Sequence, residues 1–193
     1  MRDIETTMKS FWRTESCGLS FWFVWVAALL AAAIIAPWLS SAPAPPPGQA
    51  PPTAQNVWRF LQATAPKYGV DARFAYALAV GESGLDPYAF NHGARGLMQM
   101  RPEAWAAVSN EPFHAAWDWE KNTRAALAYL AWCRGELAKH GAVSPALLAA
   151  SYHFGPDAVA GASYELRNLP RAPNDVYRKI FGGEPSPVAV PAG

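Results

Sequence analysis

Residues 74–100 read FAYALAVGESGLDPYAFNHGARGLMQM, a run that predicts a helix ending at a glutamate, followed by a loop rich in turn-forming residues. Phe74 and Leu78 lie four residues apart in a predicted helix over 71–81. Glu82 follows this helix directly and, four residues after Leu78, falls on the same face. That face is otherwise apolar, and both burial and the dipole at a helix C-terminus favour the protonated form of a carboxyl group. Glu82 is therefore a candidate general acid, and an exposed glutamate at a helix end is the alternative.

The loop after Glu82 returns to an apolar run at 96–100 that contains Gln99. A glutamine amide among apolar neighbours needs hydrogen-bond partners. Backbone groups and a bound ligand are both compatible with the sequence. The turn formers of this loop are Gly84, Asp86, Pro87, Asn91, Gly93 and Gly96.

A second polar group stands at the end of another apolar helix. Residues 149–156 read AASYHFGP, so Tyr152 and His153 come just before a Gly-Pro break. Such a helix end can present both side chains to a cleft. The alternative for Tyr152 is a core aromatic residue whose hydroxyl group reaches water.

Helical patterns dominate the rest of the folded part, and no long alternating strand pattern occurs. Cys133 lies in the apolar stripe of the longest helix, which predicts a small core residue and not a nucleophile. Ser144 is expected to cap the helix that follows it, and Gly69 to end the first one. The expected helices span 54–68, 71–81, 102–108, 118–139, 145–153 and 174–181.

The N-terminal part contains a candidate membrane anchor. Residues 19–39 read LSFWFVWVAALLAAAIIAPWL without a charge, and as a helix they would span roughly 31 Å, close to the thickness of a hydrocarbon core. The basic residues Arg2, Lys9 and Arg13 precede this segment, which places residues 1–18 in the cytoplasm and the remainder in the periplasm. The expectation is a single-pass inner-membrane protein, and the alternative is a cleaved signal peptide that releases a periplasmic or secreted protein.

Composition divides the remaining chain into three parts. Residues 40–53 read SSAPAPPPGQAPPT and predict an extended proline-rich linker. Residues 54–182 predict the folded domain, and the proline-rich residues 183–193 predict a disordered tail.

Charge and ligand spacing argue against several function classes. The net charge is +1 without a basic cluster, so nucleic-acid binding has no electrostatic support. The four histidines are scattered, and neither CxxC nor HExxH occurs, so no metal site is indicated. Cys17 and Cys133 lie on opposite sides of the apolar segment, which argues against a disulfide bond between them.

Four segments in order resemble the SLT-type lytic transglycosylases of the lysozyme-like superfamily, over about residues 57–181. The motifs are ESGLDPYA with GARGLMQMRP, then EKN with AYL, then AASYHFGPDAV, and finally Leu169-Pro170 with Tyr177. The resemblance implies a mainly α, lysozyme-like α+β domain with its catalytic glutamate at a helix C-terminus. Asn91, Arg101 and His153 depart from the family pattern.

The same resemblance implies an enzyme that cleaves the β-1,4 bond between N-acetylmuramic acid and N-acetylglucosamine in peptidoglycan strands, without a cofactor. Glu82 would act as acid and then as base, and the product would be a 1,6-anhydro sugar. The residues expected to bind or position the sugar are Gln99, Tyr152, Ser83, Asn91, Met98 and His153.

Two other functions fit the sequence. One is a hydrolytic muramidase on the same fold, in which Asp157 helps to place a water molecule. The other is a membrane-tethered module that binds peptidoglycan without cleaving it, a role compatible with an envelope-spanning assembly. The products of sacculus digestion separate the first from a transglycosylase, and loss of turbidity separates the second.

Overall fold

The computed structural model describes residues 50–192, and its first helix is α2 (Ala54–Thr64). The side chain of Thr53 caps α2 by accepting a hydrogen bond from the Asn56 N–H. The helix was expected to continue to residue 68, but the chain changes to the 3-10 helix η1 (Ala65–Tyr68). Pro66 explains the change, because it has no N–H group for the next α-helical hydrogen bond. Gly69 then ends the turn in the left-handed conformation, with a φ of 63°, as predicted.

Helix α3 (Ala72–Ser83) carries the predicted apolar stripe toward Glu82. Asp71 caps its first turn by accepting a hydrogen bond from the Phe74 N–H at 2.8 Å. Phe74 and Leu78 are both buried, which confirms the face deduced from their spacing. Gly84 ends the helix with a φ of 64° and brings the chain into the loop.

The loop after α3 contains the sheet of the described domain, a short antiparallel hairpin of β1 (Phe90–Asn91) and β2 (Ala94–Arg95). Phe90 pairs with Arg95, and Asn91 pairs with Ala94. The hairpin gives the domain the minor β component of the predicted α+β class. Two-residue strands are too short for an alternating pattern to reveal them in the sequence.

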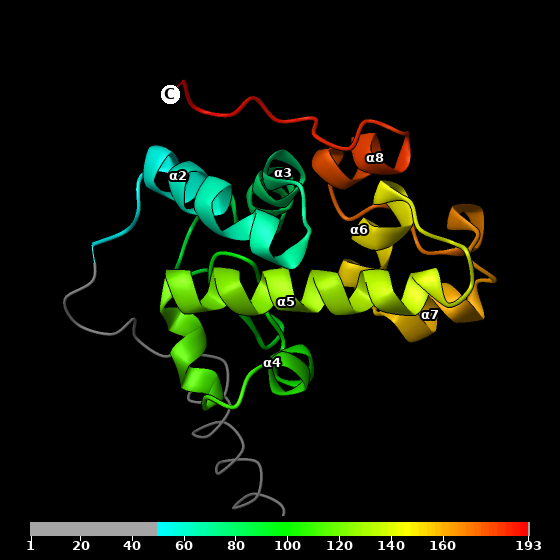
Figure 1. Ribbon diagram of the computed structural model, residues 1–193, viewed down its shortest axis with the longest axis horizontal. Coiled ribbons are helices and arrows are strands. Elements are labelled where there is room, and N and C mark those ends of the chain that lie inside the picture. The colour runs from blue at the N-terminus through cyan, green and yellow to red at the C-terminus, as the bar shows by residue number, and fades with distance from the viewer. Residues whose placement is uncertain (1–49, 193) are drawn as a thin grey trace, which may run out of the picture. The chain divides into compact units, whose positions relative to one another are not determined.

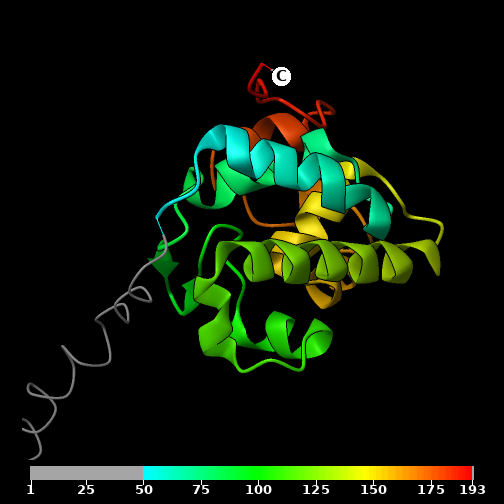
Figure 2. The ribbon, with the colours of Figure 1, turned by 60° about the vertical axis from the view of Figure 1, so that its left-hand side comes forward.

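Helix α5 (Trp119–Ala138) runs across the middle of the domain in both ribbon views (Figures 1 and 2). Helices α2 and α3 lie on one side of it, and α4 (Pro102–Val108) lies on the opposite side. The 3-10 helix η2 (Phe113–Trp117) connects α4 to α5. Asp118 begins α5 by accepting hydrogen bonds from the N–H groups of Glu120 and Lys121.

Helix α6 (Pro145–Phe154) is enclosed by its neighbours, since it packs against α5, α7 and α8. Ser144 caps it through a hydrogen bond from the Leu147 N–H, as predicted. The sequence did not predict α7 (Pro156–Gly161), which begins directly after the turn at Gly155. The remaining elements are η3 (Leu166–Asn168) and α8 (Asp175–Phe181).

The long stripe of α5 lies in the core, and Cys133 is fully buried within it. Burial raises the pKa of the Cys133 thiol to about 12, so the group stays protonated at neutral pH. Both observations confirm that Cys133 is a packing residue.

Outside the helical core, the C-terminal residues 183–192 form no helix or strand. Composition predicts a disordered tail, yet Val188 and Val190 lie partly buried against the core. Within residues 50–192, no helix is both long and apolar enough to cross a membrane. The expected cytoplasmic N-terminus (1–18), the anchor (19–39) and most of the linker (40–53) lie outside the described residues.

Candidate functional site

Glu82 occupies the last turn of α3, where the helix meets both the following loop and the final helix of the chain. Only 10% of its side chain is exposed. Gly81 allows the approach of α8, because a Cβ atom at this position would lie 3.3 Å from the Val176 side chain. The sequence pattern correctly predicted a largely buried carboxyl group at this helix end.

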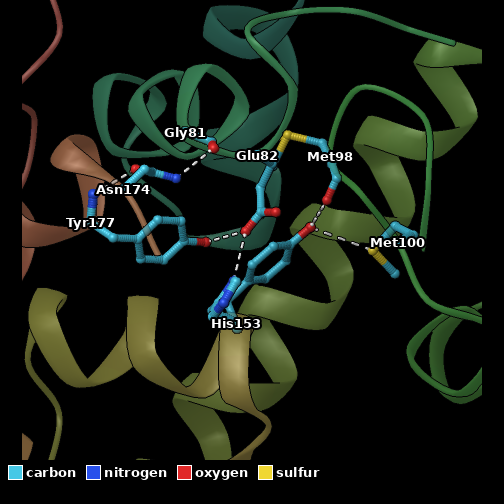
Figure 3. Close-up of polar contacts among 8 residues, drawn as sticks. Gly81, Glu82, Met98, Met100, His153, Asn174 and Tyr177 are labelled. Carbon is cyan, nitrogen blue, oxygen red and sulfur yellow. Dashed lines mark hydrogen bonds and ion pairs between the residues drawn. The ribbon is translucent and has the colours of Figure 1, made fainter. Parts of the chain in front are cut away.

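Two side chains from later helices face the same oxygen of Glu82 (Figure 3). The hydroxyl group of Tyr177 on α8 donates a hydrogen bond to Oε1. Nδ1 of His153, at the end of α6, lies 3.5 Å from the same atom. The His153 side chain is 29% exposed, whereas Tyr177 is fully buried. The carboxyl group is therefore held from the protein side by a buried hydroxyl and flanked by an imidazole that solvent can reach.

Asn174 fixes the position of Tyr177 relative to Glu82. Its Oδ1 accepts a hydrogen bond from the Tyr177 N–H at 3.2 Å and so caps α8. Its Nδ2 donates to the carbonyl oxygen of Gly81 at 2.8 Å (Figure 3). One amide thus joins the beginning of α8 to the end of α3.

The two buried tyrosines at the site remain neutral hydrogen-bond donors over the physiological pH range. Burial raises the pKa of Tyr177 well above its ordinary value, and the neighbouring charge of Glu82 acts in the same direction. The pKa of Tyr152 is raised for the same two reasons. A tyrosine that keeps its proton can donate to an oxygen but does not compete for the proton of Glu82.

Glu82 opens onto a cleft of about 720 Å³. This volume is within the range of sites that hold small organic ligands or several sugar units. Four of the residues predicted to bind substrate line the cleft together with Glu82. They are Asn91, Gln99, Tyr152 and His153.

The other two predicted substrate-binding residues do not line this cleft. Ser83 turns its hydroxyl group to the Leu97 carbonyl oxygen, to which it donates at 2.7 Å. Met98 is fully buried, and its carbonyl oxygen accepts a hydrogen bond from the Tyr152 hydroxyl at 2.6 Å. These contacts hold the loop at 95–99 in place, so Ser83 and Met98 support the wall of the site.

Asn122 on α5 provides the third attachment of this loop, and its role was not predicted from the sequence. Its Oδ1 accepts from the Met98 N–H at 2.8 Å, and its Nδ2 donates to the carbonyl oxygens of Arg95 and Ala116. The side chain is completely buried. Gly96 makes the close approach possible, because a Cβ atom there would lie 2.5 Å from the Ala116 carbonyl oxygen.

Gln99 shows the first of the two alternatives left open by the sequence, because backbone groups bind its amide. Its Nε2 donates to the carbonyl oxygens of Ala89 and Gly96, both at 2.9 Å. The residue also lines the cleft and has a φ of 46°, an unusual backbone conformation for glutamine. Backbone groups therefore occupy its amide nitrogen, and the same contacts hold the side chain at the cleft wall.

One other carboxylate belongs to the cleft lining. Glu103 lies at the start of α4 with a side chain that is 79% exposed, 3.8 Å from the Arg101 guanidinium group. Asp157, which the muramidase alternative required, is exposed on α7 and is not part of the lining. Glu82 is therefore the acid of this cleft that combines burial with fixed hydrogen-bonding geometry. Residues 50–192 contain no group of three or more His, Cys, Asp or Glu side chains suited to holding a metal ion.

Tyr177 and Asn174 were not predicted from the sequence to be parts of the site. The available signals were the helix-capping position of Asn174 and the place of Tyr177 in the last motif of the resemblance. Neither signal reveals that the two side chains meet Glu82 and Gly81, because that contact depends on the packing of α8 against α3.

Comparison with known proteins agrees with the motifs. A protein-family model described as "Transglycosylase SLT domain" matches residues 59–171, which is more than half of the chain. The match includes Glu82, the loop, α5, α6 and α7. No curated protein matches the chain.

Proposed function

The chain belongs to the transglycosylase SLT domain family, and we propose that it is a peptidoglycan lytic transglycosylase in which Glu82 is first the general acid and then the general base. The observation that carries the proposal is the setting of Glu82. It is a largely buried carboxyl group that opens onto a large cleft and is held by the Tyr177 hydroxyl.

The first step transfers a proton from Glu82 to the glycosidic oxygen between N-acetylmuramic acid and N-acetylglucosamine. The bond from that oxygen to C1 of the muramic acid then breaks, and the leaving sugar takes the proton with it. Because Oε1 accepts the hydrogen bond from Tyr177, we assign Oε2 as the oxygen that carries the proton. The 2-acetamido group of the substrate stabilises the positive charge that develops at C1.

In the second step, the C6 hydroxyl group of the same sugar attacks C1. Its proton passes to the carboxylate of Glu82, which returns to its starting form, and a 1,6-anhydro ring closes without consuming water. An attack within one sugar ring is favoured over capture of water, because the reacting groups are already connected. One carboxyl group is sufficient for this sequence of steps, whereas most glycosidases need two.

The neighbours of Glu82 have separate roles in the proposal. Tyr177 orients the carboxyl group by donating a hydrogen bond to Oε1. Gln99 and Tyr152 shape the wall against which the sugar lies, and Asn91 and His153 offer polar groups at the cleft.

Digestion of purified sacculi by the full chain in detergent tests the proposal, with released fragments identified by mass. We expect the wild type to release fragments with 1,6-anhydro ends and the Glu82→Gln variant to release none while keeping its circular dichroism spectrum. Fragments with reducing ends, heavier by one water, would instead establish a hydrolase.

Glu103→Gln is the matched control, since it removes the other carboxylate of the same cleft. We expect it to retain most of the activity because Glu103 is exposed. If Glu103→Gln were inactive and Glu82→Gln active, the assignment of the acid would be wrong.

We further propose that residues 19–39 anchor the chain in the inner membrane with the domain in the periplasm, where peptidoglycan lies. The length of this apolar segment and the basic residues before it support the proposal. Full-length protein in the membrane fraction, degraded when protease is added to spheroplasts, is the expected result. A shorter, soluble periplasmic protein would identify a cleaved signal peptide instead.

A further inference from the structure

The described part of the chain exposes two large apolar side chains, Trp132 on α5 and Val143 before α6. Trp132 is 43% exposed although it lies on the helix that crosses the centre of the domain. An indole ring that remains in water is a common feature of ligand-binding surfaces, since it offers a rigid apolar face together with an N–H group. The residues around Trp132 indicate whether its ring is part of a ligand-binding surface.

Trp132 is the outer member of an aromatic series that begins in the catalytic cleft. Tyr152 lines the cleft and meets Tyr129 edge to face, with ring centroids 5.8 Å apart. Tyr129 also lines the cleft and is stacked on Trp132, with centroids 5.4 Å apart and planes inclined by 30°. Trp132 itself lies outside the cleft lining. The three rings therefore lead from the cleft to the outer surface of α5.

A carboxylate lies on the neighbouring helix α7, close enough to Tyr129 to affect it. Asp157 is in the first turn of α7, which packs against α5 (Figure 1). Its side chain is exposed, and its negative charge contributes to raising the pKa of Tyr129, for which burial is the larger cause. An acceptor for hydroxyl groups thus lies near the aromatic rings.

This combination matches the chemistry of a β-linked sugar of the gluco configuration, such as N-acetylglucosamine. The ring substituents of such a sugar are equatorial, so each face of the ring presents axial C–H groups that pack against an aromatic ring. The hydroxyl groups at the ring edge need acceptors such as a carboxylate. A glycan strand that fills the cleft must also leave it, and an outer aromatic residue provides a surface for the next sugar unit.

We propose that Trp132, stacked on Tyr129, forms an outer subsite for a sugar unit of a β-1,4-linked glycan strand beyond the catalytic cleft. The inference rests on the proposed action on peptidoglycan, and it adds a site that distinguishes long strands from short ones. A short saccharide can occupy the cleft without reaching Trp132, whereas a longer strand contacts both.

Calorimetric titration of the full chain carrying Glu82→Gln, which prevents cleavage, tests the subsite. The probes are β-1,4-linked N-acetylglucosamine oligomers of increasing length. We expect Trp132→Ala to weaken binding of the longer oligomers roughly 3- to 10-fold and to leave the shortest bound oligomer unaffected. Trp132→Phe, which keeps a ring, should retain most of the affinity, and Val143→Ala serves as the control because Val143 is the other exposed apolar residue.

Kinetics with the active enzyme provide a second readout. Trp132→Ala should raise KM for long strands and leave kcat unchanged, since the residue lies away from Glu82. Equal affinity of wild type and Trp132→Ala at every length would overturn the inference while leaving the proposed function intact. An equal loss at every length would also overturn it, because it would indicate that Trp132 merely supports Tyr129. Binding of no oligomer or strand by any variant would contradict both the subsite and the proposed function.

Discussion

The hydroxyl group of Tyr177 donates a hydrogen bond to Oε1 of Glu82, although the two residues are 95 positions apart in the chain. Tyr177 lies in the last helix of the domain, α8, whereas Glu82 lies in the last turn of α3, near the beginning of the domain. The site is consequently complete only when α8 has packed against α3. Asn174 at the beginning of α8 stabilises this packing, because its side chain donates a hydrogen bond to the carbonyl oxygen of Gly81.

Replacing Tyr177 by phenylalanine removes this hydrogen bond and keeps the ring. A hydrogen bond to a charged group contributes about 1.5 to 3 kcal/mol, so loss of the bond at the proposed catalytic carboxyl should lower kcat by about 10- to 100-fold. The thermal midpoint should also fall by a few degrees, because the same bond contributes to stability, while the packing of the ring on His153 and Phe181 keeps the variant folded. Turbidity assays with sacculi measure the effect on rate.

Tyr164→Phe is the matched control, because Tyr164 is partly exposed and does not line the cleft. It should leave the rate unchanged. Wild-type activity in Tyr177→Phe would mean that the hydrogen bond to Glu82 has no part in catalysis.

His153 should help to position Glu82 at the cleft. Its Nδ1 lies 3.5 Å from Oε1 of Glu82, and its ring packs on that of Tyr177 with centroids 5.0 Å apart. Removing the ring leaves the carboxyl group without this neighbour. We therefore expect His153→Ala to lower kcat/KM for sacculus digestion.

The control for this measurement is His140→Ala, which changes a histidine outside the cleft. Its kcat/KM should match that of the wild type. An unchanged kcat/KM in His153→Ala would show that the imidazole does not influence Glu82.

Local signals in the sequence were sufficient to find Glu82 and the helices around it. The stripe of Phe74, Leu78 and Glu82 follows from the helical repeat alone, and both Phe74 and Leu78 are buried. Caps such as Asp71 and Ser144 are also local, because each side chain bonds to an N–H group three residues later.

Contacts between distant segments could not be predicted in the same way. The resemblance implied that Ser83 and Met98 would bind the substrate. The direction in which each group faces depends on whether a backbone carbonyl or a hydroxyl from another helix is within reach. The hairpin of β1 and β2 and the short helix α7 were missed for another reason, since elements of so few residues leave no periodic pattern.

Asn122 should be among the most sensitive positions for stability. Its amide makes three hydrogen bonds in a fully buried position, and Asn122→Ala would leave the Met98 N–H and two carbonyl oxygens without these partners. We expect the free energy of unfolding to fall by about 2 to 4 kcal/mol. Urea unfolding followed by tryptophan fluorescence gives the value.

The control is Asn110→Ala, which alters an exposed asparagine and should change stability by less than about 0.5 kcal/mol. Because Asn122 fixes the loop that forms the cleft wall, its variant should also lose activity at temperatures where it is still folded. Equal stability of the two variants would refute the role assigned to the buried amide.

Cys133 should lower the free energy of unfolding of the domain in alkali. The loss caused by its thiol should begin at a lower pH than the loss caused by the buried tyrosines. The pKa of its thiol is raised from 9.0 to about 12, mainly by burial. Below pH 9 both the native and the unfolded chain hold this proton, so its contribution to stability is fully present. Between pH 9 and about 12 the unfolded chain releases the proton while the native chain keeps it, and unfolding becomes easier by up to about 1.4 kcal/mol per pH unit. Tyr152 and Tyr177, with pKa values raised above 10.0, add to the loss only at higher pH.

Urea unfolding between pH 8 and 10 should therefore show a smaller loss of stability for Cys133→Ala than for the wild type. The control is Leu137→Ala, a buried apolar truncation in the same helix, which should show the same dependence of stability on pH as the wild type. An unchanged slope in Cys133→Ala would mean that the thiol loses its proton equally readily in the native and unfolded states.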